Sequence, residues 1–154
     1  MATPRKTAWL ALVAIAALAS AASAADPIYT KEGLALSGYD AVAYFTDGKP
    51  VRGKAEFEHA WEGVKWRFAS AANRDAFAKS PEKYAPQYGG WCAYAVSRNY
   101  TAPTDPEAWK VVDGKLYLNY DKAVRVLWEK DLPEAIRKGD KNWPAVLSRP
   151  SQGN

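Results

Sequence analysis

The stretch EFEHAWEGVKWRF, residues 56–68, indicates the fold most directly, because it contains a complete hairpin. Two segments rich in aromatic residues, 56–61 and 64–68, are separated only by Glu62-Gly63, which is typical of a tight turn. In the second segment Trp66 and Phe68 alternate with basic residues, as in a strand with one buried face. The stretch therefore predicts two antiparallel strands whose aromatic side chains face a core.

Helix signals follow this hairpin. Ser70 is a typical N-cap and predicts a helix that runs to about Lys79. Ser80-Pro81-Glu82 combines a second N-cap with proline at the first helical position, and so predicts another short helix. Gly89-Gly90 interrupts the pattern. The following WCAYAV, residues 91–96, is apolar enough to be buried, either as a helix or as a strand.

A second hairpin is predicted further along the chain, where segments 109–112 and 115–120 are joined by Asp113-Gly114. Asp121 then caps a helix to about Lys130, and Pro133 opens a last helical stretch that we expect to break near Gly139. Upstream, AVAYF at residues 41–45 is predicted to be a strand. Strands and helices mix without a βαβ rhythm, which favours an α+β fold: a small antiparallel sheet of hairpins packed with short helices.

The N-terminal residues 1–24 are predicted to be a cleavable signal peptide. Arg5 and Lys6 precede an uncharged apolar run, residues 7–20, and Ala22-Ser23-Ala24 is a typical cleavage signal. The run is shorter than the roughly 20 residues that span a bilayer. We therefore expect a periplasmic or secreted protein with no membrane span after cleavage, cut near Ala24 or Ala25.

The remaining chain is expected to form one domain. The predicted boundaries are a lead-in over residues 25–32, a domain over 33–147 and a flexible tail over 148–154. The whole chain has a formal charge of +4, which falls to about +2 without Arg5 and Lys6. No basic run is interleaved with aromatic residues, so the sequence gives no indication of a nucleic-acid partner.

The residues available for chemistry are few, because the chain has one cysteine, Cys92, and one histidine, His59. An internal disulfide is excluded, and the single thiol is either buried and inert or a ligand or reactive group. The usual zinc site of four Cys and His ligands cannot be built. A metal site would need Cys92, with His59 or nearby oxygen ligands, or a partner protein to complete it.

The segment QYGGWCAY, residues 87–94, contains the remaining candidates. Gly89 and Gly90 allow the backbone to approach another group closely, and Cys92 lies among aromatic rings. One interpretation is a tight turn into a buried segment. The other is a small pocket with Cys92 at its floor, in which Tyr88, Gly89, Gly90 and Trp91 are binding residues.

These segments together resemble the YHS domain family, and most closely its exported YHS domain-containing (seleno)proteins. The resemblance covers about residues 33–147. It is carried by LSGYDAVAYF (36–45), WEGVKWRFAS (61–70), Phe77, SPEKYAPQYGGWCA (80–93) and KLYLNY (115–120). Through this resemblance Tyr39 and Asp40 join the candidate binding residues.

The resemblance implies a small module of the kind found in copper-transporting ATPases and some oxygenases, often proposed to bind metal. The positions where the family's metal ligands would be expected are here Val42–Ala43, Ala69 and Asn73, which are not metal ligands. The selenocysteine-containing relatives imply thiol or selenol chemistry instead, and Cys92 is the one candidate here for an equivalent of their special residue.

Three functions remain open from the sequence. The first is a binding module related to metal, with a copper ion held by Cys92 together with His59 or nearby oxygens, and with a metal partner protein. The second is a thiol-redox protein that uses Cys92 with a partner's thiol. The third is a module that binds a small organic ligand on its aromatic surface without chemistry. The family context, rather than the residues themselves, favours the first function slightly, and with it a binding module over an enzyme.

Overall fold

The computed structural model of the protein describes residues 26–149. A four-stranded sheet forms one side of the molecule, with strand order β1-β2-β4-β3. Its strands are β1 (Thr30–Lys31), β2 (Leu34–Ala35), β3 (Lys54–Trp61) and β4 (Val64–Phe68). The predicted hairpin is β3 with β4, in which His59 pairs with Trp66. The β2–β4 pair is parallel, so the sheet is mixed rather than purely antiparallel.

The second predicted hairpin forms a separate two-stranded sheet of β5 (Asp105–Val112) and β6 (Lys115–Asn119). Both hairpins turn through two residues with positive φ, which are Glu62-Gly63 and Asp113-Gly114. Positive φ at both central positions is what a two-residue hairpin turn with the right twist requires. The two residues of each turn therefore explain why the hairpins form where the sequence predicted them.

Helices fill the rest of the described chain. They are α1 (Ala43–Thr46), α2 (Ala71–Lys79), α3 (Pro81–Tyr84), α4 (Ala93–Ser97), α5 (Lys122–Glu129) and α6 (Leu132–Leu147). Two short 3₁₀ turns lie at Leu36–Gly38 and Gln87–Gly90. Two of the predicted caps are confirmed: Ser70 accepts from the Asn73 N–H, and Asp121 accepts from the Val124 N–H. Ser80 precedes α3 as predicted, but its side chain makes no capping hydrogen bond. The α+β fold class is confirmed as well.

The structure differs from the sequence prediction at two elements. Residues 41–45 were predicted to be a strand, but Ala43–Thr46 is helix α1. The last helix was expected to break near Gly139, yet α6 continues through it to Leu147. Gly139 is buried against the ring of Tyr88, where a Cβ would collide with the phenol. The glycine therefore serves helix packing and not helix termination.

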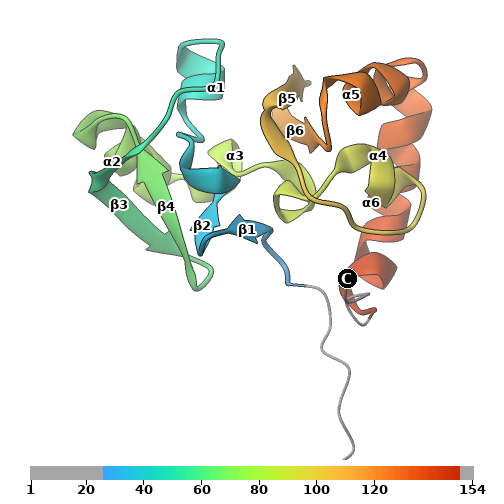
Figure 1. Ribbon diagram of the computed structural model, residues 1–154, viewed down its shortest axis with the longest axis horizontal. Coiled ribbons are helices and arrows are strands. Elements are labelled where there is room, and N and C mark those ends of the chain that lie inside the picture. Colours follow the sequence, from blue (N-terminus) through green and yellow to red (C-terminus); the bar gives the residue numbers. More distant parts are fainter. Residues whose placement is uncertain (1–25, 150–154) are drawn as a thin grey trace, which may run out of the picture.

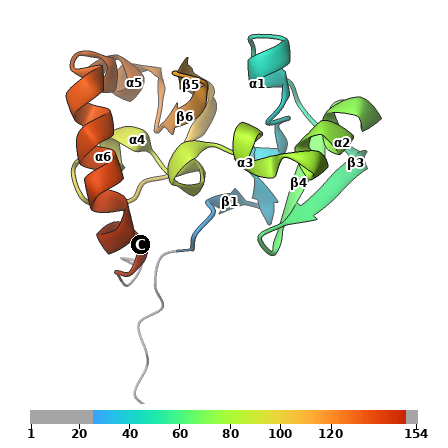
Figure 2. The same ribbon diagram turned by 180° about the vertical axis from the view of Figure 1, so that it is seen from behind.

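The core has two aromatic clusters that share strand β6. Leu116 and Leu118 belong to the cluster under the first sheet, whereas Tyr117 between them belongs to the cluster with Tyr88 and Trp128. The alternation of side chains along a strand sends neighbouring residues to opposite faces. Figure 1 shows the two halves on either side, and Figure 2 shows them from behind with α6 along the outer edge.

Candidate functional site

The carboxylate of Asp40 is buried and accepts four hydrogen bonds. Its Oδ1 accepts from the backbone N–H groups of Val42 and Ala43, at 2.8 and 3.2 Å. Its Oδ2 accepts from the Ala69 N–H at 2.9 Å and from the Asn73 side-chain amide at 2.8 Å. Asp40 is 0% exposed. It fixes the start of α1, which explains why the segment is helical, and ties it to the beginning of α2.

The four donors are the residues at which the family resemblance placed metal ligands. In this chain those positions supply N–H groups to a carboxylate, and the lone pairs of that carboxylate are already used. A metal needs free, deprotonated donor atoms. The residues present around Asp40 therefore do not fit a resident metal ion. Asp40, predicted as a binding residue, has a hydrogen-bonding role in holding two helices.

The thiol of Cys92 is closed off from solvent at the start of α4. Only 1% of the residue is exposed. Its Sγ accepts from the Tyr120 N–H at 3.3 Å, and its S–H points to Asn119 Oδ1 at 3.8 Å. Burial raises the pKa of this thiol, although neighbouring backbone N–H groups partly oppose the effect. These surroundings favour the neutral thiol over the reactive thiolate.

Cys92 and His59 lie in different halves of the molecule. His59 is half-buried on β3, where its ring lies 6.2 Å from that of Phe77. In both ribbon views β3 and α4 lie on opposite sides of the molecule (Figures 1 and 2). Within residues 26–149, no group of three or more His, Cys, Asp and Glu side chains is arranged to hold a metal ion.

Residues 88–91 are covered by the chain's own N-terminal segment. The Gly89 carbonyl accepts from the Tyr29 N–H, and a Cβ on Gly89 would collide with the Pro27 carbonyl. The indole of Trp91 donates to the Asp26 carbonyl at 2.8 Å and packs on Tyr29. The close backbone approach that Gly89 predicted is therefore made by residues 26–29 and not by a ligand.

The neighbouring candidates Tyr88 and Gly90 also make internal contacts. Tyr88 donates to Asp140 Oδ1 at 2.9 Å, and the Gly90 carbonyl accepts from Thr104 Oγ1 at 2.7 Å. Tyr39 is half-buried beneath the guanidinium of Arg52, 5.0 Å from its ring centre. Among the predicted binding residues, Tyr39 lines a polar hollow of about 540 Å³, and Gly89 lines a smaller one of about 230 Å³.

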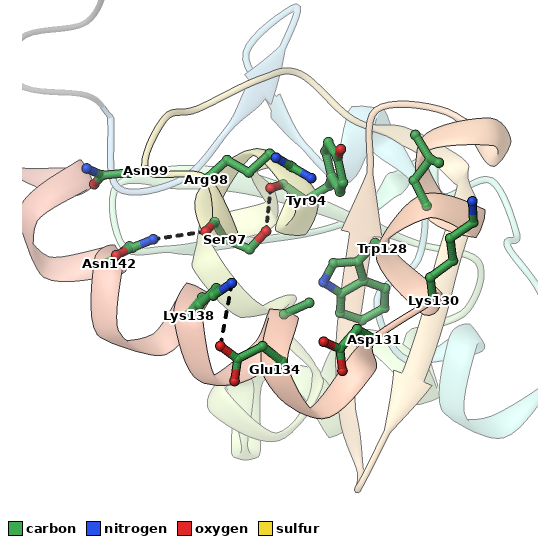
Figure 3. A pocket seen from close by; sticks show the side chains of 12 residues that line it. Tyr94, Ser97, Arg98, Asn99, Trp128, Lys130, Asp131, Glu134, Lys138 and Asn142 are labelled. Carbon is green, nitrogen blue, oxygen red and sulfur yellow. Dashed lines mark hydrogen bonds and ion pairs between the residues drawn. The ribbon is translucent and has the colours of Figure 1, made fainter.

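A larger pocket, of about 680 Å³, lies between α4, α5 and α6, and we call it the α4–α6 pocket. Its walls include Tyr94 and Ser97 from α4, Trp128 from α5 and Lys138 from α6. Figure 3 shows the side chains of these helices around a common hollow. None of the residues predicted as sites from the sequence lines it.

The charged side chains that line the α4–α6 pocket differ in how far neighbouring charges neutralise them. Glu134 accepts two short hydrogen bonds from Arg137, which lower the pKa of its carboxyl to about 2, and it also pairs with Lys138. Arg98 lies over the ring of Tyr94, with its guanidinium carbon 4.4 Å from the ring centre. Because the lining residues come from positions 94–142, no single sequence motif could have indicated this pocket.

Fold and site together define a small α+β domain with a ligand-sized pocket. Residues 42–88 match the YHS domain family, which confirms the resemblance over this part of the chain. The narrower likeness to exported (seleno)proteins stays a prediction. Comparisons with curated proteins and with solved structures found no significant match. In the described chain no helix is both long and apolar enough to cross a membrane.

Proposed function

We propose that this protein is a non-catalytic module that binds a small organic molecule in the α4–α6 pocket. The observation that carries the proposal is the pocket itself, with about 680 Å³ between three helices and with both ring and charged side chains in its walls. Ligand sites are usually concave, with apolar surface and a few polar groups that orient the ligand. Of the three functions left open by the sequence, this one has the most structural support.

The properties of Cys92 and His59 weigh against a catalytic pair. A nucleophilic thiol needs a base within hydrogen-bond reach and enough exposure to meet its substrate. Cys92 is buried, its pKa is raised, and its nearest polar partners are Asn119 and Tyr120. The same burial weighs against thiol exchange with a partner protein.

Metal binding is the second candidate, because YHS domains are often linked to it and residues 42–88 match that family. In this chain it would depend on Cys92, since the positions around Asp40 do not fit a metal. A soft cuprous ion is the form that a thiolate prefers. Binding would have to displace the hydrogen bonds that Sγ makes to Asn119 and Tyr120.

Export is part of the proposal and rests on the sequence of residues 1–24, which lie outside the described residues. The mature chain would begin at Ala25 or Asp26 and act in the periplasm or outside the cell. The mass of the protein recovered from that compartment tests this. Recovery of an intact chain that begins at Met1 and fractionates with membranes would contradict it.

The binding function is tested by thermal-shift screening of the mature protein against neutral, anionic and cationic aromatic molecules of similar size. We expect saturable stabilisation by one charge class, since a ligand that binds only the folded state raises its stability. Ala135→Phe should remove the effect by filling the pocket, whereas Ala72→Phe, at an exposed alanine on α2, should not. No saturable shift with any class would contradict the proposal.

A further inference from the structure

The indole N–H of Trp128 is a buried donor with no hydrogen-bond partner among the described residues. Trp128 is 1% exposed and lines the α4–α6 pocket. A buried donor without a partner is uncommon in folded proteins and calls for an explanation. Figure 3 shows its nitrogen on the edge of the ring that faces the hollow toward Lys138 and Ser97. An acceptor atom of a bound molecule would satisfy it.

Cationic groups converge on the same hollow. The ammonium of Lys138 points toward the pocket in Figure 3, and the guanidinium of Arg98 lies above it beside Tyr94. The Ser97 hydroxyl does not compete for the ligand, because it already donates to the Tyr94 carbonyl at 2.7 Å. The lining therefore offers the unpartnered Trp128 N–H together with the cations Arg98, Lys130 and Lys138, of which Lys138 also pairs with Glu134.

The balance of charge in the walls limits how much negative charge a ligand can carry. Arg98, Lys130 and Lys138 line the pocket together with Asp131 and Glu134, which leaves a small positive excess. A dianion would meet repulsion from the two carboxylates, and an amine would meet the cations. Leu127, 45% exposed, supplies apolar surface for the body of the molecule.

We propose that the α4–α6 pocket takes a small organic acid with one carboxylate and an apolar body. One carboxylate oxygen accepts from the Trp128 N–H, and the charge lies between Lys138 and Arg98. The inference rests on the binding function proposed above and adds the chemical class of the ligand. Because charged acceptors form stronger hydrogen bonds, the acid is preferred to its neutral amide.

The experiment uses three probes of matched shape, 3-phenylpropionate, 3-phenylpropionamide and 3-phenylpropylamine, titrated calorimetrically into the mature protein. We expect the carboxylate to bind about tenfold more tightly than the amide, and the amine to bind most weakly. Phenyl phosphate, a dianion at pH 8, should bind no more tightly than the carboxylate. Equal or tighter binding of the amide or the amine would overturn the acid assignment and leave the pocket's binding function standing. No binding by any probe would overturn the inference, and the broader screen would then decide the proposed function separately.

Variants separate the ionic contact with Lys138 from the hydrogen bond donated by Trp128. Lys138→Met, at an exposed position, should weaken carboxylate binding about tenfold and leave amide binding unchanged. Trp128→Phe should weaken both acid and amide, because both offer an oxygen acceptor to the indole. Lys115→Met and Trp91→Phe are the matched controls outside the pocket, and they should change neither the affinity for the carboxylate nor that for the amide. Carboxylate affinity that is unchanged in both Lys138→Met and Trp128→Phe would overturn the inference.

Discussion

The side-chain amide of Asn73 donates a hydrogen bond of 2.8 Å to the Oδ2 of Asp40, 33 residues earlier in the chain. This contact and the three backbone N–H bonds to the same carboxylate join α1, the end of β4 and α2. The positions where the family resemblance implied metal ligands supply hydrogen-bond donors to this one buried carboxylate.

Removal of the Asp40 carboxylate should destabilise the fold severely. We expect Asp40→Ala to lower the free energy of unfolding by about 3 kcal/mol or more, because it leaves buried N–H groups without an acceptor. Asn73→Ala should cost about 1–2 kcal/mol, since it removes one donor. Urea denaturation measures both, with Asp47→Ala at an exposed position as the control. A cost for Asp40→Ala no larger than that for Asp47→Ala would contradict this role.

The Cys92 thiol should resist alkylation in the native protein. Burial excludes the reagent and raises the pKa of the thiol, so little thiolate is present at pH 8. We expect the rate of modification by iodoacetamide to follow unfolding and to rise steeply near the urea midpoint. Cys92→Ala should cost about 1–2 kcal/mol through lost packing. Rapid stoichiometric labelling of the folded protein at pH 7 would restore the redox hypothesis.

Stability should fall in alkali. Desolvation by burial raises the pKa of Cys92, and it raises the pKa of Tyr117 to about 12. The folded state holds these protons more tightly than the unfolded state. The contribution of these two groups to the free energy of unfolding is therefore complete below about pH 9 and declines toward pH 12. Urea midpoints at pH 8, 9, 10 and 11 measure the decline. Burial raises the pKa of Tyr44 and Tyr88 as well, so Tyr117→Phe should reduce but not abolish the part above pH 10. A midpoint that stays constant to pH 11 would contradict the assignment.

Gly139→Ala should destabilise the protein even though alanine favours helix formation. In the middle of α6 the substitution gains about 1 kcal/mol of helix propensity. The new Cβ, however, collides with the buried Tyr88 phenol, and such overpacking costs typically about 1–3 kcal/mol. Thermal unfolding tests the balance, with Lys141→Ala on the exposed side of α6 as control. A rise in melting temperature for Gly139→Ala would show that Tyr88 moves away without loss.

Metal removal should leave the fold unchanged. A structural metal contributes folding free energy, so its chelation unfolds a domain that depends on it. The described residues hold instead two aromatic clusters and a hydrogen-bonded Asp40. We expect the same melting temperature with and without a strong chelator, and at most one cuprous ion per chain that is lost in Cys92→Ala. A large drop in melting temperature on addition of the chelator would reveal a ligand set built from residues other than Cys92 and His59.

Local sequence patterns predicted the elements whose cause is itself local. Glu62-Gly63 and Asp113-Gly114 adopt the positive φ that their hairpins need, and Ser70 and Asp121 cap the helices that follow them. In each case the deciding contact lies within a few residues of the chain. The resemblance over residues 42–88 was likewise carried by contiguous motifs.

The candidate site depended on contacts between distant residues. The sequence singled out Cys92 because it is the only cysteine, but its burial depends on Asn119 and Tyr120, which lie on and beside another strand. Gly89 indicated a close approach, and only the folded chain shows that Pro27 makes it.

By itself the sequence determined the α+β class, both hairpins and the caps at Ser70 and Asp121, because turn and cap energies arise between neighbouring residues. Tertiary structure alone decided that residues 43–46 are helical, since the carboxylate that holds them also needs Ala69 and Asn73. It also decided where a ligand can bind. The α4–α6 pocket brings Tyr94, Trp128 and Lys138 together from separate helices, and packing between helices sets which donors are left without a partner.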